Sequence, residues 1–294
     1  MSIIKSLSVG NGDMFYIKHN SDNFSIIDSC MNEDNRENIV EELQREANGK
    51  NIVRFISTHP DDDHIRGLYY LNEQWPILNF YCVKNEASKE DETDDFNEYC
   101  NLKDSDKAFY LEKGCKRYWM NQANEARGSA GIHILWPITS NKHYKEALEQ
   151  ARKGSSPNNI SPIIQYSLQD GAEVLWMGDL ETDFMENIED DVSLEEVDIL
   201  FAPHHGRDSG KVPTSWLEKL DPQIIVIGEA PSEHLNYYQG FDTIKQNSAG
   251  ELLFECVENA VHIYIENPSY EEDFLDDENK SGKDGLHYLG TLRL

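Results

Sequence analysis

The stretch STHPDDDHIRGL, at residues 57–68, places four possible metal ligands, His59, Asp61, Asp63 and His64, within six positions. Carboxylates held this close repel one another and raise each other's proton affinity, whereas a bound dication neutralises them. The stretch directly follows an expected strand, and strand ends are common places for sites in layered α/β proteins. Aspartates that cap a helix in an acidic turn are the alternative, but two histidines at this spacing favour a metal site.

Two further stretches end an apolar run in side chains that bind metals. In VLWMGDLE the run ends at Asp179, and in VDILFAPHHGRDSG it ends at His204 and His205. A Gly-Asp pair by itself indicates only a turn. Consecutive side chains diverge, so we expect one histidine to bind a metal and the other to donate a proton or contact an oxyanion. Together the three clusters predict a site for two metal ions, bridged by Asp179 because a carboxylate can bind two ions.

Short apolar segments predict the elements that would position these side chains. Strands are expected within 2–19 and 24–30, around a turn at 10–12, and at 51–58, 77–83, 132–137, 161–168, 172–179, 197–203, 223–230, 250–257 and 260–266. Helical patterns are expected at 34–48, 64–75, 142–153, 182–188 and 213–220. Strands that alternate with helices indicate sheets covered by helices, which is an α/β layered fold.

Composition excludes several classes of protein. The 294 residues include 26 basic and 55 acidic ones, a formal net charge of −29, which argues against broad coating of a long polyanion. The five cysteines are scattered and lack a CxxC pair, so neither a disulfide framework nor a thiolate zinc site is expected. No apolar run approaches the roughly 20 residues of a membrane helix, and the start lacks a secretory signal, so we expect a cytoplasmic protein that does not contact the membrane.

Acidic residues concentrate in two segments, 85–106 and 270–279, which we expect to be solvated loops. They are also the surfaces that could bind protein partners. The simplest domain organisation is one domain at 1–267 with an insertion at 85–128, followed by an acidic C-terminal extension at 268–294.

These motifs, in this order, resemble the metallo-β-lactamase fold superfamily. Its hallmarks are a His-x-His-x-Asp-His loop, a later Gly-Asp bridge and a further histidine. More narrowly, VGNGDM, HPDDDHIRGL, NNISPIIQYSLQDGAEVLWMGDLE and VDILFAPHHG followed by LDPQIIVIG resemble the hydrolase domain of bacterial DNA-uptake channel proteins and the phosphorylcholine esterases of that type. The resemblance spans residues 1 to about 265 and implies a four-layer αββα sandwich.

Carried over residue by residue, the resemblance implies these metal ligands: His59, Asp61, Asp63, His64, Asn158, Asp179 and His205. His59 and Asp61 would hold one ion. Asp63 and His64 would hold the second, and Asp179 would bridge the two. Asn158 stands where many relatives have a third histidine, although an asparagine in a turn before a strand is almost as good an interpretation.

The resemblance also implies roles around the metals. We prefer His205 as the ligand and His204 as the contact to the transition state, and the predicted catalytic residues are Asp63, His204 and Arg66. Asp13 and Asp28 would orient ligand histidines, because the tautomer of an imidazole must be set by a partner. His234, in a late loop, is a weaker candidate.

The chain departs from the common pattern of the family. Asp61 replaces a histidine and Asn158 offers an amide oxygen, and oxygen-rich ligation shifts the preference from zinc towards manganese. Arg66 stands where relatives often have glycine, and it is equally well interpreted as a partner for a substrate phosphate or as a surface residue. The expected cofactor is therefore two divalent ions, either zinc or manganese.

The implied chemistry is hydrolysis by a metal-activated water, with phosphodiesters preferred because hard ions suit phosphate oxygens. A small nucleotide or a nucleic acid end suits the negative charge better than a long duplex. Hydrolysis of a carboxylic ester, thioester or lactone on the same site is the first alternative. A non-catalytic, partner-binding component of a multi-protein bacterial system is the second. Fold alone does not decide among them.

Overall fold

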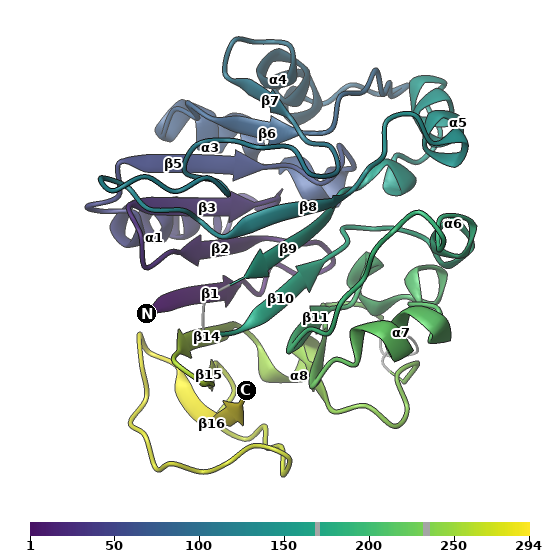
Figure 1. The fold of residues 1–294 in the computed structure, drawn as a ribbon. Coiled ribbons are helices and arrows are strands. Elements are labelled where there is room, and N and C mark those ends of the chain that lie inside the picture. Colours follow the sequence, from purple (N-terminus) through teal and green to yellow (C-terminus); the bar gives the residue numbers. More distant parts are fainter. Residues whose placement is uncertain (168–170, 232–235) are drawn as a thin grey trace.

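The computed structural model, which describes residues 1–167, 171–231 and 236–294, contains two β-sheets packed face to face (Figure 1). The larger sheet has nine strands in the order β16-β15-β14-β1-β2-β3-β5-β6-β7. Its strands are β1 (Ser2–Ser6), β2 (Phe15–Lys18), β3 (Asn23–Ile27), β5 (Ile52–Ile56), β6 (Phe80–Cys82), β7 (Ala108–Tyr110), β14 (Leu252–Val257), β15 (Ala260–Ile265) and β16 (His287–Arg293). A short segment, β4 (Ser29–Cys30), follows β3.

The smaller sheet has six strands in the order β13-β12-β11-β10-β9-β8. Its strands are β8 (Ile132–Trp136), β9 (Ile163–Ser167), β10 (Glu173–Trp176), β11 (Ile199–Phe201), β12 (Ile224–Ile227) and β13 (Thr243–Lys245). The pairs β10–β11, β11–β12 and β12–β13 are parallel, whereas β8–β9 and β9–β10 are antiparallel. All the strands that the sequence predicts are therefore present, although Leu168 at the end of one prediction lies outside the described residues.

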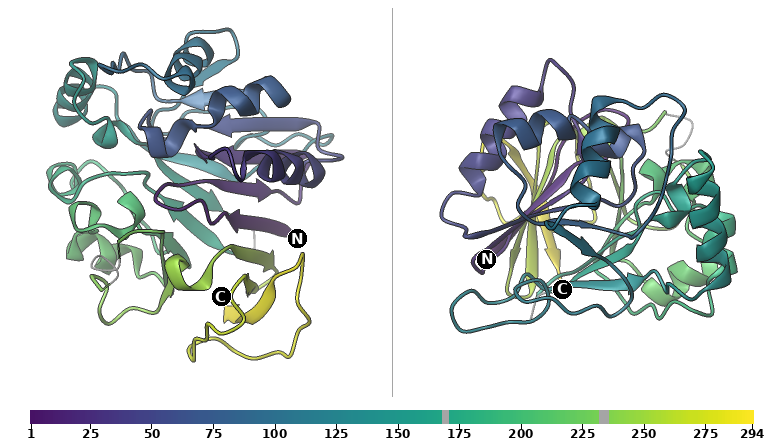
Figure 2. Two further views of the ribbon diagram at one scale, coloured as in Figure 1. Left: turned by 180° about the vertical axis from the view of Figure 1, so that it is seen from behind. Right: turned by 90° about the horizontal axis from the view of Figure 1, so that it is seen from above.

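Helices cover the outer face of each sheet (Figure 2). The helices are α1 (Arg36–Glu46), α2 (Asp62–Ile65), α3 (Leu68–Gln74), α4 (Asp94–Lys103), α5 (Lys142–Arg152), α6 (Thr182–Asn187), α7 (Thr214–Leu220) and α8 (Gln246–Ala249). One buried cluster joins Leu43 of α1 and Leu71 of α3 to Phe55 of β5. A second joins Ile56, the next residue of β5, to the smaller sheet and to Trp216 of α7. Successive side chains of a strand point to opposite faces, so these clusters define four layers, and the predicted αββα sandwich is confirmed.

Two predictions about helices are wrong in detail. The single helix expected at 64–75 is divided into α2 and α3, because Gly67 takes a left-handed φ of +82°. The acidic segment 85–106, expected to be loop, contains α4, whose cap Thr93 accepts a hydrogen bond from Phe96 N–H. This helix packs Phe96 and Tyr99 into the core. These tertiary contacts stabilise the helix, although its acidic sequence by itself is typical of a solvent-exposed loop.

The expected insertion at 85–128 and the expected C-terminal extension at 268–294 each contribute a strand to the larger sheet. β7, from 85–128, pairs in parallel with β6, and β16, from 268–294, pairs antiparallel with β15. The domain boundaries at these segments remain predictions. The five cysteines are all free. Among the described residues, no helix is long and apolar enough to cross a membrane.

Candidate metal centre

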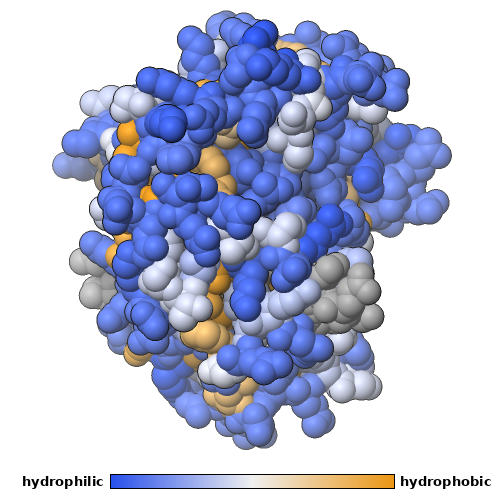
Figure 3. All heavy atoms as spheres, turned by 90° about the vertical axis from the view of Figure 1, so that its right-hand side faces the viewer, coloured by the Kyte–Doolittle hydropathy of each residue, from blue (hydrophilic) through white to orange (hydrophobic). Residues whose placement is uncertain are grey.

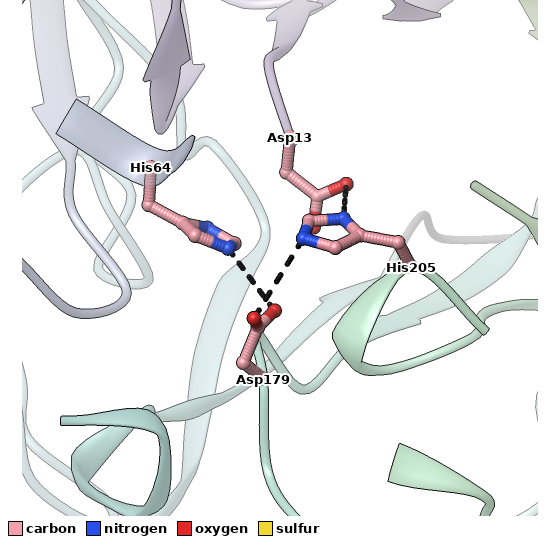
Figure 4. A group of neighbouring side chains, drawn as sticks. All are labelled: Asp13, His64, Asp179 and His205. Atoms are coloured by element: carbon pink, nitrogen blue, oxygen red, sulfur yellow. Dashed lines mark hydrogen bonds and ion pairs between the residues drawn. The ribbon is translucent and has the colours of Figure 1, made fainter. Parts of the chain in front are cut away.

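Two histidines and two aspartates, His64, His205, Asp13 and Asp179, meet at the ends of strands from both sheets (Figure 4). His64 comes from α2 after β5, Asp179 from the turn after β10, and His205 from a 3-10 turn (His204–Gly206) after β11. His64 Nε2 lies 3.1 Å from Asp179 Oδ1, and His205 Nε2 lies 3.7 Å from Asp179 Oδ2. Asp179 is therefore the carboxylate around which the imidazoles are arranged, and its role as a bridge between two ions remains a prediction.

Asp63 and His59 complete the central group. Asp63 Oδ2 lies 3.4 Å from His205 Nε2, and His59 Nε2 lies 3.9 Å from Asp179 Oδ2. The rings of His59 and His64 have centroids 4.1 Å apart. Five of the predicted ligands thus share one buried region, although their roles as ligands remain predictions.

Two carboxylates orient His64 and His205 through hydrogen bonds to the Nδ1 atoms of the two rings. Asp28 accepts a hydrogen bond from His64 Nδ1 at 2.8 Å, and Asp13 accepts one from His205 Nδ1 at 3.0 Å. Each bond leaves Nε2 directed towards Asp179. A carboxylate in this position sets the tautomer of a ligand imidazole and raises its basicity. The geometry therefore matches the orienting role that the resemblance implies for Asp13 and Asp28.

Hydroxyl groups that the sequence analysis missed hold His59 and the Asp28 carboxylate. Thr58 donates to Asp28 Oδ2 through its hydroxyl at 2.6 Å and to Oδ1 through its N–H at 2.7 Å. The His59 Nδ1 atom lies 3.0 Å from Thr58 Oγ1 and 3.2 Å from Ser161 Oγ, which also accepts from Asp179 N–H at 3.3 Å. Serine and threonine are too frequent in loops for sequence to mark them as part of a site.

The buried polar atoms of this region fit a bound cation. Within the described residues, the Nε2 atoms of His59, His64 and His205 and Oδ1 of Asp179 are buried and have no hydrogen-bond partner. Desolvated polar atoms without partners are costly and rare in native proteins. Asp13, His64, Asp179 and His205 each offer one ligand atom, and these atoms all lie within 4.8 Å of one another. Imidazole and carboxylate are ordinary ligands of divalent metals, so the donor set fits a divalent metal ion.

The pKa values of the centre show how closely the charges of its side chains are coupled. Burial lowers the pKa of His205, but Asp13 and Asp179 outweigh it and raise the value to about 10. Burial opposes ionisation of Asp179 too, yet His64 and His205 hold its pKa well below the usual range. For His59, burial and the neighbouring His64 lower the pKa well below its usual value. Positive charge is thus favoured at His205, beside the carboxylates, whereas His59 is held in its neutral form.

Gly178 gives the turn before Asp179 its shape. Its φ is +52°, and a Cβ atom there would lie 2.7 Å from Ser161 Oγ and 2.9 Å from Thr58 Cβ. The carbonyl of Gly178 also accepts a hydrogen bond from His204 N–H at 3.0 Å. His204 and His205 have φ values of 53° and 55°, an unusual conformation for residues other than glycine. Backbone strain of this kind concentrates at functional sites.

Three of the predicted residues have their contacts elsewhere. Asp61 is the N-cap of α2, and its Oδ1 lies 3.1 Å from Lys89 Nζ. Asn158 accepts a hydrogen bond from Ser156 Oγ at 2.5 Å. Arg66 is exposed at the C-cap of α2. Capping, the alternative interpretation of the acidic run, therefore applies to Asp61, and the site roles of these three residues remain predictions.

His204 lies beside the cluster and is less buried than His205. Its Nε2 atom lies 3.7 Å from Asp179 Oδ2, and its Nδ1 atom lies 2.9 Å from Ser209 Oγ. Burial lowers the pKa of His204. This position is compatible with the predicted contact to a transition state, which remains untested. His234 lies outside the described residues.

Comparison with known proteins finds similarity in fold to solved structures and no similarity in sequence to a known family. No protein-family model and no curated protein matches the sequence. Among solved structures, the chain is similar to Igni18, a novel metallo hydrolase from the hyperthermophilic archaeon Ignicoccus hospitalis, with a TM-score of 0.48 and 15% identity over 86% of this chain and 99% of that one. It is also similar to a mutant of the CmlA beta-hydroxylase, with a TM-score of 0.47 and 9% identity over 87% of this chain and 54% of that one.

At such low similarity, the activities of these two proteins say nothing by themselves about this chain. Its own fold and site define the class: a four-layer αββα protein with a buried His/Asp cluster that can hold a metal ion.

Proposed function

We propose that this protein is a metal-dependent hydrolase whose substrate is a phosphoester, with a phosphodiester or a nucleic acid end preferred. The observation that carries the proposal is the set of buried, unpartnered Nε2 and carboxylate oxygen atoms that face one another at the ends of the strands. A structural core has no need for such atoms, whereas a hydrolytic metal centre requires them.

The proposed cofactor is two divalent ions, manganese or zinc. His59, Asp63, His64, Asp179 and His205 are the residues that would hold them. A divalent ion there supplies two functions when bound: it lowers the pKa of water towards neutrality and stabilises charge on the oxygen atoms of the substrate.

The residues of the chain supply orientation and proton handling. Asp28 and Asp13 keep the Nδ1 atoms of His64 and His205 protonated, so that each Nε2 atom presents its lone pair to the centre. Asp63 would orient the attacking water through its carboxylate. His204, beside Asp179, would donate a proton or a hydrogen bond to the leaving group.

The test of the function is Asp179→Asn, with Asp183→Asn as the matched control because Asp183 is exposed on α6. Loss of the carboxylate charge among the imidazoles should lower the metal content of the purified protein and reduce hydrolysis of bis(p-nitrophenyl) phosphate by about a hundredfold or more. The control should keep both. Plasma mass spectrometry measures the metal, and p-nitrophenolate release measures the rate.

Three outcomes of this test would contradict the proposal. Metal loss without any loss of a measurable hydrolytic rate would show that the metal is not catalytic. Activity confined to p-nitrophenyl acetate and thioesters would replace the phosphoester assignment with the ester alternative. A protein that binds metal tightly and hydrolyses neither class of ester would favour the partner-binding alternative.

A further inference from the structure

Arg207 is a cation beside the metal centre that the proposed function does not use. It follows the His204–Gly206 turn directly, and its Nη1 atom lies 3.4 Å from His204 Nε2. Its Nη2 atom donates to Asn11 Oδ1 at 2.5 Å, and Asn11 belongs to the β1–β2 loop that also carries Asp13. The guanidinium is therefore held one side chain away from Asp179.

The charge of Arg207 is not balanced by the protein. No Asp or Glu within the described residues forms an ion pair with its guanidinium, and its Nε atom is buried without a hydrogen-bond partner. A second cation near the site is different, because Lys89 Nζ lies 2.6 Å from Asp62 Oδ1 and 3.1 Å from Asp61 Oδ1. Lys89 is thus neutralised, whereas Arg207 keeps its positive charge available.

An anionic substrate needs such a charge here. The chain has a formal net charge of −29, and the side of the molecule in Figure 3 is largely hydrophilic. Bound divalent ions would do no more than neutralise the four carboxylates around the centre, Asp13, Asp28, Asp63 and Asp179, so a net attraction for a phosphate group requires a further fixed cation. Guanidinium suits the task, because its planar fork binds two phosphate oxygens at once.

We propose that Arg207 binds the phosphate oxygens of the substrate and so selects anionic phosphoesters over neutral esters. The inference rests on the proposed function and deepens it. Arg207 takes the role of partner for a substrate phosphate, for which Arg66 was a candidate from the sequence. Arg66 lies exposed at the end of α2. Arg207 would act as a binding and specificity residue, while His204 and the metal ligands handle the chemistry.

The first experiment measures binding of inorganic phosphate to the metal-loaded protein by calorimetry. Arg207→Gln should raise the dissociation constant about tenfold or more, because a charge-assisted pair of hydrogen bonds is lost. Arg207→Lys, which keeps the charge without the fork, should bind with intermediate affinity. Arg45→Gln is the matched control, because Arg45 is an exposed arginine of α1. Metal content should be the same in all four proteins.

A second readout separates specificity from a merely structural role. In Arg207→Gln the KM for bis(p-nitrophenyl) phosphate should rise while the KM for p-nitrophenyl acetate stays unchanged. Equal phosphate affinity in Arg207→Gln and the unchanged protein overturns the proposal, and so does a loss of affinity in Arg66→Gln alone. If Arg207→Gln fails to fold, Asn11→Ala, which removes only the tether, should still weaken phosphate binding, and unchanged affinity would again overturn the proposal.

The two proposals fail in different ways. Arg207-dependent phosphate binding without hydrolysis of any ester would sink the proposed function and leave the anion site standing. Hydrolysis of phosphodiesters with a KM that is independent of Arg207 would do the reverse.

Discussion

At the scale of single residues, the centre consists of side chains whose charges are balanced only by one another. Asp179 lies among four imidazoles, and two further carboxylates hold the Nδ1 atoms of His64 and His205. Removal of one member leaves the others buried with an unpaired charge, which is costly. The effects of substitutions within this group should therefore be far from additive.

Asp61 differs from the rest of the group, because it is paired with a lysine. Its Oδ1 atom lies 3.1 Å from Lys89 Nζ, and the cation would have to give way before Asp61 could bind a metal. Lys89→Met should therefore tighten binding of a divalent ion by about two- to fivefold, the scale expected for a partly exposed ion pair. A titration with Mn²⁺ measures this.

The control for this prediction is Lys142→Met, a lysine on α5 with a side chain that is 79% exposed and lies 3.7 Å from Glu146. It should leave metal affinity unchanged. Unchanged affinity in Lys89→Met as well would show that Asp61 is a helix cap and takes no part in metal binding.

At the scale of elements, the site depends on turns that follow strands of both sheets. The turn after β10 brings Gly178 against Thr58 and Ser161, so that the loops from the two sheets touch. The backbone hydrogen bond from His204 N–H to Gly178 C=O then ties the third turn to the second. Rigid strands with short turns hold such a constellation more firmly than long loops do.

Gly178→Ala should disrupt this contact. The substitution strains a φ of +52° and places a Cβ atom 2.7 Å from Ser161 Oγ, so we expect a loss of about 1–3 kcal/mol in the free energy of unfolding, together with reduced metal content. Chemical denaturation and metal analysis check the two effects.

Gly49→Ala separates strain from crowding, because Gly49 has a φ of +83° and a Cβ atom added there would meet nothing within 4 Å. It should lose stability from strain alone and keep its metal. Equal metal content in both variants would contradict the role that we give to the Gly178 turn.

His19, which follows β2, makes stability depend on pH away from the metal centre. Burial, followed by the charges of Arg54 and Lys50, holds its pKa well below the usual value of 6.5. The unfolded chain therefore takes up a proton near that pH while the folded protein does not. Stability is fully present above that pH and falls as the pH decreases, with a slope of at most about 1.4 kcal/mol per pH unit from this group.

His19→Gln should flatten this dependence. Between about pH 6.5 and about pH 5, the free energy of unfolding should fall less steeply in the variant than in the unchanged protein. His287→Gln, at an exposed position, should keep the original slope. The same slope in both variants would mean that other groups cause the loss of stability in acid.

At the scale of the whole molecule, the C-terminal segment completes the larger sheet without reaching the site. β16 pairs with β15, and the Tyr264 and Tyr288 rings have centroids 5.6 Å apart. Asp276 in the acidic loop forms an antiparallel β-bridge with Thr291 of β16, so the loop covers part of this edge strand. Acidic residues on an edge of this kind oppose strand addition by other chains.

Removal of residues 267–294 should therefore lower the melting temperature and promote self-association, because β15 becomes an exposed edge. Metal content should not change, because every residue of the cluster lies between Asp13 and His205. Differential scanning fluorimetry and light scattering test the first part, and metal analysis tests the second. A truncated protein that stays monomeric at the original melting temperature would show that this segment is dispensable for the fold.

Sequence alone located most of the strands, because the apolar runs and turn residues that define them are local properties, but it did not predict β7, β13 or β16. It also located the three His/Asp clusters, since each directly follows such a run. Helix α4 was missed because its acidic, charged sequence resembles a loop, and only the packing of Phe96 and Tyr99 against the sheet stabilises it.

Only the tertiary structure decided which atoms meet. His205 and Asp13 are 192 positions apart, and Asp61 and Lys89 are 28 apart, so no local pattern reports either contact. The same applies to Arg207, which reaches Asn11 across 196 positions while Arg66 remains exposed. Residue types and spacing can thus indicate that a metal is bound. The partners of each side chain depend on how the turns of two separate sheets come together, and only the packed sandwich defines that arrangement.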